Sequence, residues 1–213
     1  MSKAEDSRPD WLRWAQRVQA VAQTGLTYSQ DPYDRERYEE LREIAVEMTA
    51  AGLDEDKEAL RPLLTSGTGY PTPKVDVRAV VFRDDELLLV RERRSQRWTF
   101  PGGWADIGDT PSAAAERETL EESGYRVKAY KALAILDKTR HEHPPSLDYT
   151  YKILVACRFE GGEPKTSHEI DDVGFFTEAA LADLDLDLDR TTPGQITMAL
   201  THHRDPALPT DLD

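Results

Sequence analysis

Residues 65–74, TSGTGYPTPK, separate two parts of the chain that follow different hydrophobic periods. Two glycines and two prolines within this stretch interrupt regular structure. Before it, apolar residues recur with the helical period, and after it they alternate or run together as they do in strands. The sequence therefore predicts a small helical domain at residues 1–66 and an α+β domain at residues 70–206.

Helix-capping residues divide the first part of the chain. The first helix is expected to end at Gly25, because glycine is common just after a helix C-terminus. Asp31 followed by Pro32 is typical of an N-cap and a first helical residue, and Gly52 is expected to end this second helix. A third, shorter helix is expected at residues 54–60.

The two longer helices each carry an apolar stripe. The stripes consist of Trp11, Trp14, Val18, Val21 and Ala22 in the first helix and Tyr38, Leu41, Ile44, Ala45 and Met48 in the second. Three helices alone bury little apolar surface against one another. Their stripes must therefore pack against the rest of the chain or against a second copy of it.

The second part alternates between predicted strands and helices. Strands are expected at residues 75–83, 86–92, 98–100, 125–136, 149–159 and 173–177, and helices at 110–124 and 193–204. Asp84 and Asp85 form a hairpin turn, and residues 137–148 form a polar loop that contains proline. This order predicts a mixed sheet with helices packed on it.

Composition restricts the partners of the chain. Its 41 Asp and Glu residues against 27 Lys and Arg give a net charge of −14, which disfavours non-specific binding to nucleic acid or to an anionic membrane. Solubility alone explains such a charge equally well. No apolar run approaches the roughly 18 residues of a membrane span. Cys157 is the only cysteine and is expected to be buried and inert, so we expect a cytoplasmic protein.

The stretch RETLEESG places Glu118, Glu121 and Glu122 on one face of a helix. Like charges at this spacing repel each other by a few tenths of a kcal/mol per pair. A solvated acidic face is one explanation. However, the segment FPGGW just upstream has glycines that permit close backbone approach. Carboxylate and carbonyl oxygens suit Mg²⁺ or Mn²⁺, so the sequence predicts a divalent metal site that offsets the repulsion.

The ends of this helix are also marked. Thr110 and Pro111 are expected as N-cap and first helical residue, and Gly124 as the C-terminal stop. Ala113 and Leu120 lie opposite the glutamates and are expected to pack against the sheet.

The spacing of these residues resembles the Nudix box, G-x5-E-x7-R-E-U-x-E-E-x-G-U, where U is a bulky apolar residue. Gly103 is followed after five residues by Asp109 and after seven more by the stretch from Arg117 to Tyr125, RETLEESGY. Asp109 stands in place of glutamate and Thr119 in place of an apolar residue. Aspartate keeps the charge needed to pair with Arg117, and Thr119 can pack through its methyl group.

The resemblance implies an α/β/α sandwich for residues of about 70–205 and assigns roles within the box. It implies Glu118 and Glu122 as metal ligands, Glu121 as a third ligand or a base, the carbonyl of Gly102 as a backbone ligand, and Gly103, Asp109, Arg117 and Gly124 as supports of the box. Glu169, before the last predicted strand, is our preferred loop residue for the base, and Glu142 is another candidate. For either loop residue taken alone, a solvated surface acid is the favoured explanation.

Several residues near the box are candidates for binding substrate. Arg91 and Arg93 match phosphate geometry, although charges at a strand end also protect a sheet edge. Trp98, Phe100 and Trp104 can stack on a base or pack in a core. The loop histidines His141, His143 and His168 are expected to be solvent-exposed.

The acidic segment LADLDLDLD, residues 181–189, resembles the start of a calcium loop. It lacks the required glycine and glutamate, because Leu188 and Gly194 stand at those positions. We therefore expect a solvated connecting segment.

The N-terminal helices are similar to the extension of a bacterial Nudix subgroup that includes CDP-choline and ADP-ribose pyrophosphatases, and this resemblance implies a homodimer. We expect an Mg²⁺- or Mn²⁺-dependent pyrophosphohydrolase that cleaves a small nucleoside diphosphate derivative such as ADP-ribose or CDP-choline. Two alternatives remain: trimming of RNA 5′ ends, which the acidic surface disfavours, and a non-catalytic sensor that binds a nucleotide.

Overall fold

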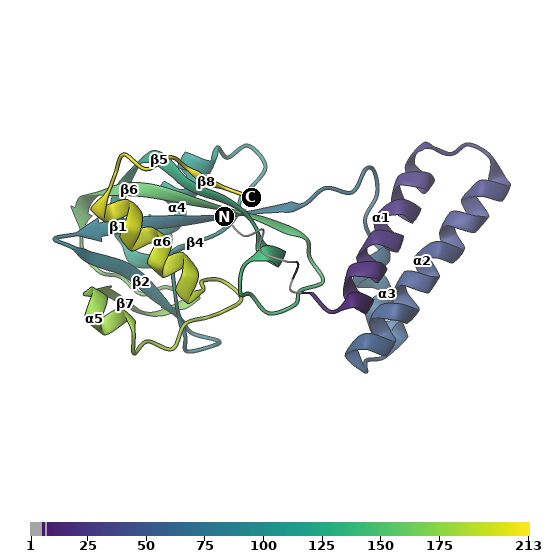
Figure 1. The fold of residues 1–213 in the computed structure, drawn as a ribbon, viewed down its shortest axis with the longest axis horizontal. Coiled ribbons are helices and arrows are strands. Elements are labelled where there is room, and N and C mark those ends of the chain that lie inside the picture. The colour runs from purple at the N-terminus through teal and green to yellow at the C-terminus, as the bar shows by residue number, and fades with distance from the viewer. Residues whose placement is uncertain (1–5, 7) are drawn as a thin grey trace. The chain divides into compact units, whose positions relative to one another are not determined.

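The computed structural model describes residue 6 and residues 8–213, and the chain forms two compact units (Figure 1). One unit comprises residues 8–73 together with Pro145–Asp148, and the other comprises Lys74–Pro144 and Tyr149–Asp213. Within these described residues, no helix combines the length and the apolar character that crossing a membrane requires.

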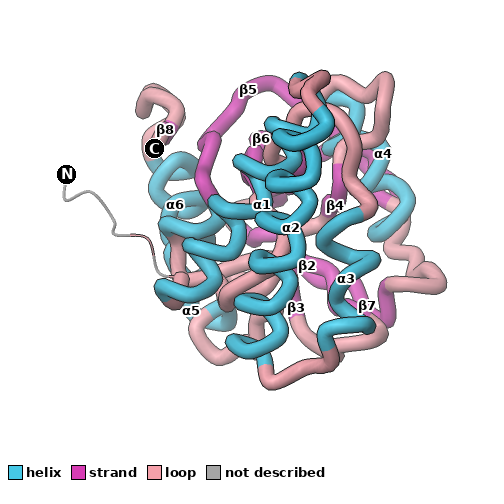
Figure 2. Tube along the Cα trace, turned by 90° about the vertical axis from the view of Figure 1, so that its right-hand side faces the viewer, coloured by secondary structure: helices cyan, strands magenta, loops and turns pink. Residues whose placement is uncertain are grey.

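The first unit is helical. Its helices are α1 (Asp10–Tyr28), α2 (Pro32–Leu53) and α3 (Lys57–Thr65), and Figure 2 shows them in cyan. Asp31 caps α2 as predicted, because its side chain accepts hydrogen bonds from the N–H groups of Tyr33 and Asp34. Pro32 follows as the first helical residue.

The predicted helix ends at Gly25 and Gly52 are wrong. Helix α1 continues past Gly25, where an added Cβ would overlap the ring of Tyr38 in α2. A Cβ at Gly52 would likewise overlap the ring of Trp11. Asp54, in the left-handed conformation with φ 54°, ends α2 instead. Both glycines therefore serve close packing between helices rather than chain termination.

The buried face of the helical unit differs from the predicted stripes. Its fully buried apolar residues are Leu12, Ala15, Ala22, Ala45, Val46 and Leu60. Trp14 and Val21 of the predicted stripe are 48% and 59% exposed, and Ile44 is also exposed. The contact between α1 and α2 thus buries mostly small side chains, and Trp14, Val21 and Ile44 are left exposed.

A short segment from the middle of the chain folds with these helices. The side-chain amide of Gln16 in α1 donates hydrogen bonds to the carbonyl oxygens of Ser146 and Leu147, each at 3.0 Å. The predicted polar loop at residues 137–148 thus ends in four residues, Pro145–Asp148, that belong to the helical unit.

The second unit is built on one mixed sheet. Its strands are β1 (Lys74–Arg83), β2 (Glu86–Glu92), β3 (Trp98–Thr99), β4 (Gly102–Trp104), β5 (Tyr125–Asp137), β6 (Thr150–Gly162), β7 (Ile170–Phe176) and β8 (Asp211–Leu212). The order is β3-β2-β1-β6-β5-β8, and β4 pairs with β1 and β7 with β2. Strands β1 and β6 are parallel, as are β5 and β8, and the other pairs are antiparallel. The six predicted strands are confirmed, and β4 and β8 are additional.

Helices cover both faces of this sheet. They are α4 (Pro111–Ser123), α5 (Glu178–Leu181) and α6 (Pro193–Arg204), together with a short 3-10 helix at Lys138–Arg140. Side chains alternate along β1, so Val77, Ala79 and Val81 pack with α4, whereas Val80 packs in the cluster that contains residues of α6. Figure 1 shows α6 lying across the near face of the strands. The structure confirms the predicted α/β/α sandwich.

Helix α4 has the predicted caps but a different buried face. Thr110 accepts a hydrogen bond from the N–H of Ala113 at 3.1 Å, and Gly124 ends the helix with φ 76°. Leu120 and Ala113, expected to pack on the sheet, are exposed. The buried residues are instead Ala114, Ala115, Thr119, Glu122 and Ser123. These mostly small side chains let α4 lie close to the strands. Glu122 belongs to this buried face and therefore points inward.

The acidic segment at residues 181–189 is only partly solvated, which corrects the prediction. Leu186 lies in the core, and Asp187 is buried. The carboxylate of Asp187 accepts a hydrogen bond from the hydroxyl of Ser95 at 2.9 Å, and its N–H donates to the carbonyl of Trp98 at 2.8 Å. Cys157 is buried as predicted, and burial raises the pKa of its thiol to about 12.

Candidate active site

Helix α4 presents its three glutamates at different depths. Glu122 is buried, and its carboxylate accepts a hydrogen bond from the N–H of Gly102 at 2.8 Å. Glu118 is partly buried, and its carboxylate would lie 3.7 Å from a Cβ built on Gly103. Glu121 is exposed. The three side chains thus range from solvent to the backbone of β4, where Gly102 and Gly103 leave room for them.

Gly102 is the backbone element that this arrangement requires. Its φ of 136° is a conformation that favours glycine, and an added Cβ would overlap the carbonyl oxygen of Val77. Strand β4 pairs with β1 so that Gly102 lies opposite Arg78 and Gly103 opposite Val77. The close approach of β4 to β1 therefore fixes the N–H that Glu122 binds.

Burial shifts the two deeper carboxyls toward their neutral forms. It raises the pKa of Glu122 to about 8, although the charge of Arg78 and the Gly102 hydrogen bond act in the opposite direction. Burial also raises the pKa of Glu118, against the opposing effect of Arg117. In both cases the loss of solvation on burial outweighs the nearby arginine charge.

Arg117 is the counter-ion of the acidic helix. Its guanidinium lies 2.8 Å from both Asp109 and Glu118, 3.3 Å from Glu121 and 3.4 Å from Asp106. The carboxylates raise the pKa of Arg117, with the hydrogen bond to Asp109 as the largest cause. The shorter aspartate at position 109 thus reaches the box arginine, as the resemblance implied.

Thr119 occupies the other unusual position of the box without leaving a polar group unsatisfied. It is fully buried, and its hydroxyl donates to the carbonyl oxygen of Ala115 one turn earlier at 2.7 Å. Its methyl group remains free to pack, so this position tolerates a small polar residue.

The donor set fits a hard divalent cation by its chemistry, since it consists of carboxylate oxygens and glycine backbone. In the parts of the chain that the structure describes, no three His, Cys, Asp or Glu side chains gather closely enough to hold one ion. Arg117 instead takes up oxygens of Glu118 and Glu121. A bound cation would compete with this arginine for the same oxygens.

The candidate bases lie at separate places. Glu121 is exposed on α4, and Glu169 is exposed just before β7 beside His168. The backbone carbonyl of Glu169 accepts a hydrogen bond from the N–H of Arg93 at 2.7 Å, which places Glu169 beside the end of β2. Glu142 lies in the turn after the 3-10 helix, and its carboxylate is near the start of α6, 3.9 Å from a Cβ built on Gly194.

The predicted phosphate-binding arginines are engaged with β7. Arg91 lies 3.1 Å from Asp171 and 3.4 Å from Asp172, and Arg93 lies 3.4 Å from Asp171. These ion pairs join β2 to its neighbouring strand.

The three aromatics near the box differ in exposure. Phe100 is buried in the core, and Trp98 packs edge-on against Phe176. Trp104 is 51% exposed on β4, with the ammonium group of Lys74 5.4 Å from its ring centroid. Trp104 therefore offers a ring to solvent next to Gly103 on β4.

The prediction that His143 is solvent-exposed is wrong. Its Nδ1 donates to the carbonyl oxygen of Leu188 at 2.6 Å, and its Nε2 accepts from the side-chain amide of Gln195 at 3.0 Å. Burial lowers the pKa of His143 to about 3, so the ring is neutral. His141 is only partly exposed and pairs with Asp213, whereas His168 is exposed as predicted.

Sequence reasoning missed a group of buried charges beside the box. Asp76 and Arg78 of β1, Glu92 of β2 and Lys152 of β6 are all buried. Arg190 contacts Glu92 at 2.6 Å. A signal was available, because charged residues interrupt strands that are otherwise apolar, as in VDVRAVVF.

Two family models match the chain. One is described as a UDP-X-like, N-terminal oligomerisation domain and matches residues 9–64, and the other is the NUDIX domain and matches residues 72–196. The chain therefore belongs to the Nudix hydrolase family.

Individual relatives resemble the chain over most of its length. It is 43% identical to YjhB of Bacillus subtilis, provisionally named an ADP-ribose pyrophosphatase, over 95% of this chain and 97% of that protein. The crystal structure of a UDP-X diphosphatase is 33% identical, covers 96% of this chain and 98% of its own, and has a TM-score of 0.62. An ADP-ribose pyrophosphatase from Streptococcus suis is 36% identical with a TM-score of 0.60 and covers 67% of this chain and 100% of its own.

Proposed function

We propose that the protein is a metal-dependent pyrophosphohydrolase that cleaves the diphosphate of a small nucleoside diphosphate derivative. The observation that carries this proposal is the buried carboxylate of Glu122 on the N–H of Gly102, with Glu118 set against Gly103. Two relatives named for ADP-ribose and UDP-X cleavage match nearly the whole chain. ADP-ribose and a UDP-linked compound are therefore candidate substrates, and CDP-choline is a third because the helical extension resembles that of CDP-choline pyrophosphatases.

The metal would be Mg²⁺ or Mn²⁺. Glu118, Glu122 and the carbonyl of Gly102 are the proposed ligands, with Glu121 as a third carboxylate. When bound, such an ion neutralises diphosphate charge and lowers the pKa of a coordinated water. Arg117 also pairs with Asp109 at 2.8 Å, so it would keep one carboxylate partner if a cation displaced it from the glutamates.

The residues of the chain would hold substrate and remove a proton. We assign Trp104 to stacking on the base, because its ring is open to solvent. Arg91 and Arg93 would contact phosphate by exchanging their pairs with Asp171. Glu121 and Glu169 are the proposed proton acceptors from the attacking water, and both carboxylates are accessible.

A substrate panel tests the proposal. Purified protein would be assayed with ADP-ribose, CDP-choline, a UDP-sugar and 5′-triphosphate RNA, each with Mg²⁺ and with Mn²⁺. We expect one of the nucleoside diphosphate derivatives to be cleaved fastest, with no turnover in EDTA. Preferred cleavage of RNA would favour the alternative hydrolase, and binding of ADP-ribose without turnover would favour a sensor.

The choice of base is tested by substitution. Glu121→Gln and Glu169→Gln are compared with Glu142→Gln, whose carboxylate lies at the start of α6. Loss of the proton acceptor should lower kcat by roughly 100-fold or more with little change in KM. If Glu142→Gln alone gives that loss, both of our assignments are wrong.

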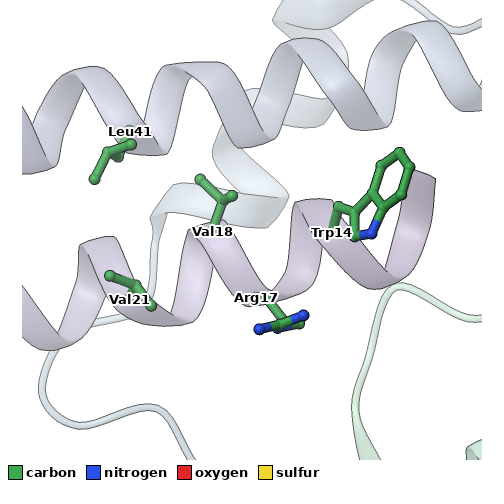
Figure 3. A pocket seen from close by; sticks show the side chains of 5 residues that line it. All are labelled: Trp14, Arg17, Val18, Val21 and Leu41. Carbon is green, nitrogen blue, oxygen red and sulfur yellow. The ribbon is translucent and has the colours of Figure 1, made fainter. Parts of the chain in front are cut away.

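We also propose that the helical unit forms a homodimer. Trp14, Val18 and Val21 of α1 and Leu41 of α2 line a groove of about 350 Å³, together with Arg17 (Figure 3). This groove face is apolar, and the matching family model is described as an oligomerisation domain. A second copy of the chain is the proposed occupant.

The single, buried thiol supports the cytoplasm as the compartment.

A further inference from the structure

Strand β1 buries a guanidinium that no role assigned above explains. Arg78 is only 4% exposed. Its Nε donates to Asp76 at 2.9 Å, and its Nη1 donates to the carbonyl oxygen of Phe100 at 3.2 Å. Lys152, on the adjacent strand β6, pairs with the other carboxylate oxygen of Asp76. Buried charges are costly unless they are paired, so this group needs an explanation.

The contacts of Arg78 place it at the backbone of the site. In the pairing of β1 with β4, Arg78 lies directly opposite Gly102. Its bond to the Phe100 carbonyl fixes the chain two residues before that glycine. Because the N–H of Gly102 binds Glu122, one guanidinium constrains the segment on which the deepest carboxylate depends.

The charge of Arg78 also reaches the acids of the site. It stabilises the ionised forms of Glu92, Glu118 and Glu122, in opposition to their burial. Asp76 has two cationic partners, Arg78 and Lys152, so one carboxylate faces two cations. Lys152 thus leaves part of the guanidinium charge available to the glutamates.

We propose that Arg78 is a positioning residue of the metal site: it anchors the backbone that holds Glu122 and keeps the site glutamates in place before a cation arrives. Asp76 orients the guanidinium, and Lys152 limits its neutralisation. The inference rests on the proposed function in one respect, namely that the glutamates bind a divalent cation.

The test measures Mn²⁺ binding directly, by calorimetry and by the EPR signal of free Mn²⁺, without turnover. Arg78→Met should weaken Mn²⁺ binding by about 10- to 100-fold, the range typical of groups that orient metal ligands. Arg78→Lys keeps the charge but cannot bridge Asp76 and Phe100, so it should recover only part of the affinity. Circular dichroism melts establish that each variant is folded.

If the charge of Arg78 merely repelled the metal, its removal would strengthen Mn²⁺ binding instead of weakening it. Unchanged or tighter Mn²⁺ binding in folded Arg78→Met or Arg78→Lys would overturn the inference while leaving the proposed hydrolase intact. Absence of Mn²⁺ binding by the wild-type protein would overturn both. On a cleaved substrate, the rates of both variants should rise toward the wild-type rate as the Mn²⁺ concentration is increased, which a smaller folded fraction would not produce.

Arg158 provides the matched control. It is also an arginine of the sheet, on β6, but it is exposed and lies over the ring of Tyr130 at 5.0 Å. Arg158→Met should retain wild-type Mn²⁺ affinity. Lys152→Gln leaves Arg78 in place but makes it the one remaining cationic partner of Asp76 within this group. The Mn²⁺ affinity of this variant should therefore fall between those of Arg78→Met and the wild type.

Discussion

The sheet unit buries three charged side chains, Asp76 and Arg78 of β1 and Lys152 of β6. The helical unit does the reverse, because it exposes the large apolar side chains of Trp14 and Val21 to solvent. Each arrangement is unfavourable for an isolated domain. Buried ions need partners, and exposed large apolar side chains leave a face that water solvates poorly. This difference supports the proposal that the sheet unit carries the chemistry and the helical unit the association.

Replacing the deepest glutamate should separate chemistry from stability in the sheet unit. We expect Glu122→Gln to lower kcat/KM by more than ~100-fold, because a lost ligand costs more than a lost orienting partner. The amide oxygen of glutamine still accepts from Gly102, so the variant should fold. Initial rates and thermal melts provide the measurements.

Glu116→Gln on the same helix is the control. Glu116 accepts a hydrogen bond from the N–H of Ala129, and a glutamine oxygen can do the same. Wild-type turnover in Glu122→Gln would contradict the proposed catalytic role of this part of the sheet unit.

The proposed association of the helical unit is tested by placing a charge in the groove face. Val21→Glu should weaken the dimer by about 2 kcal/mol, or roughly 30-fold in Kd, as loss of an interface anchor does. Because Val21 is exposed, the monomer should remain folded. Sedimentation at several concentrations measures the change.

Tyr130→Ser, an exposed aromatic of β5, should leave association unchanged. A dimer that persists in Val21→Glu with wild-type affinity would show that the groove face is not the contact.

The buried histidine of the sheet unit makes stability depend on pH. His143 has a folded pKa of about 3, below its ordinary value of 6.5, so the unfolded chain binds a proton that the folded chain does not. Its stabilising contribution is complete above pH 6.5 and is lost as pH falls toward 3. We expect about 1 kcal/mol less unfolding free energy from this group at pH 5 than at pH 6.

Urea unfolding of the wild type and of His143→Gln at a series of pH values measures this contribution as a difference in slope. His168→Gln, at an exposed histidine, should follow the wild-type curve. Parallel curves for wild type and His143→Gln would contradict the assignment of a neutral buried ring.

The smallest effect is expected at the unusual box position. Thr119→Val should change the unfolding free energy by less than ~1 kcal/mol, because the hydroxyl is bonded only within its own helix. Thr119→Ser removes a buried methyl group and should cost about 1 kcal/mol. If valine proves worse than serine in chemical unfolding, the hydroxyl contributes more than its contact with Ala115 accounts for.

Features set by neighbouring residues were predictable from sequence. Thr110 caps α4 and Gly124 ends it because both act on backbone groups within one turn. The hairpin at Asp84 and Asp85 follows the same logic, since both adopt left-handed conformations with φ 50° and 66°. Strand periodicity located most of the sheet, and fixed spacing located the box.

Features set by distant partners were not predictable. Angular position on α4 groups the glutamates correctly, but the N–H of Gly102 decides which of them is buried. Gly25 has the residue type of a helix end, and only Tyr38 on another helix reveals its use. Strand β8 has two residues and pairs with β5, so no local pattern announces it.

The bonds from Gln16 to Ser146 and Leu147 have a practical consequence for dissecting the molecule. A fragment beginning at residue 74 would retain Pro145–Asp148 but lose the amide that secures it. That stretch should then become the preferred cleavage point in limited proteolysis. Cutting the polypeptide once therefore does not yield two self-contained pieces.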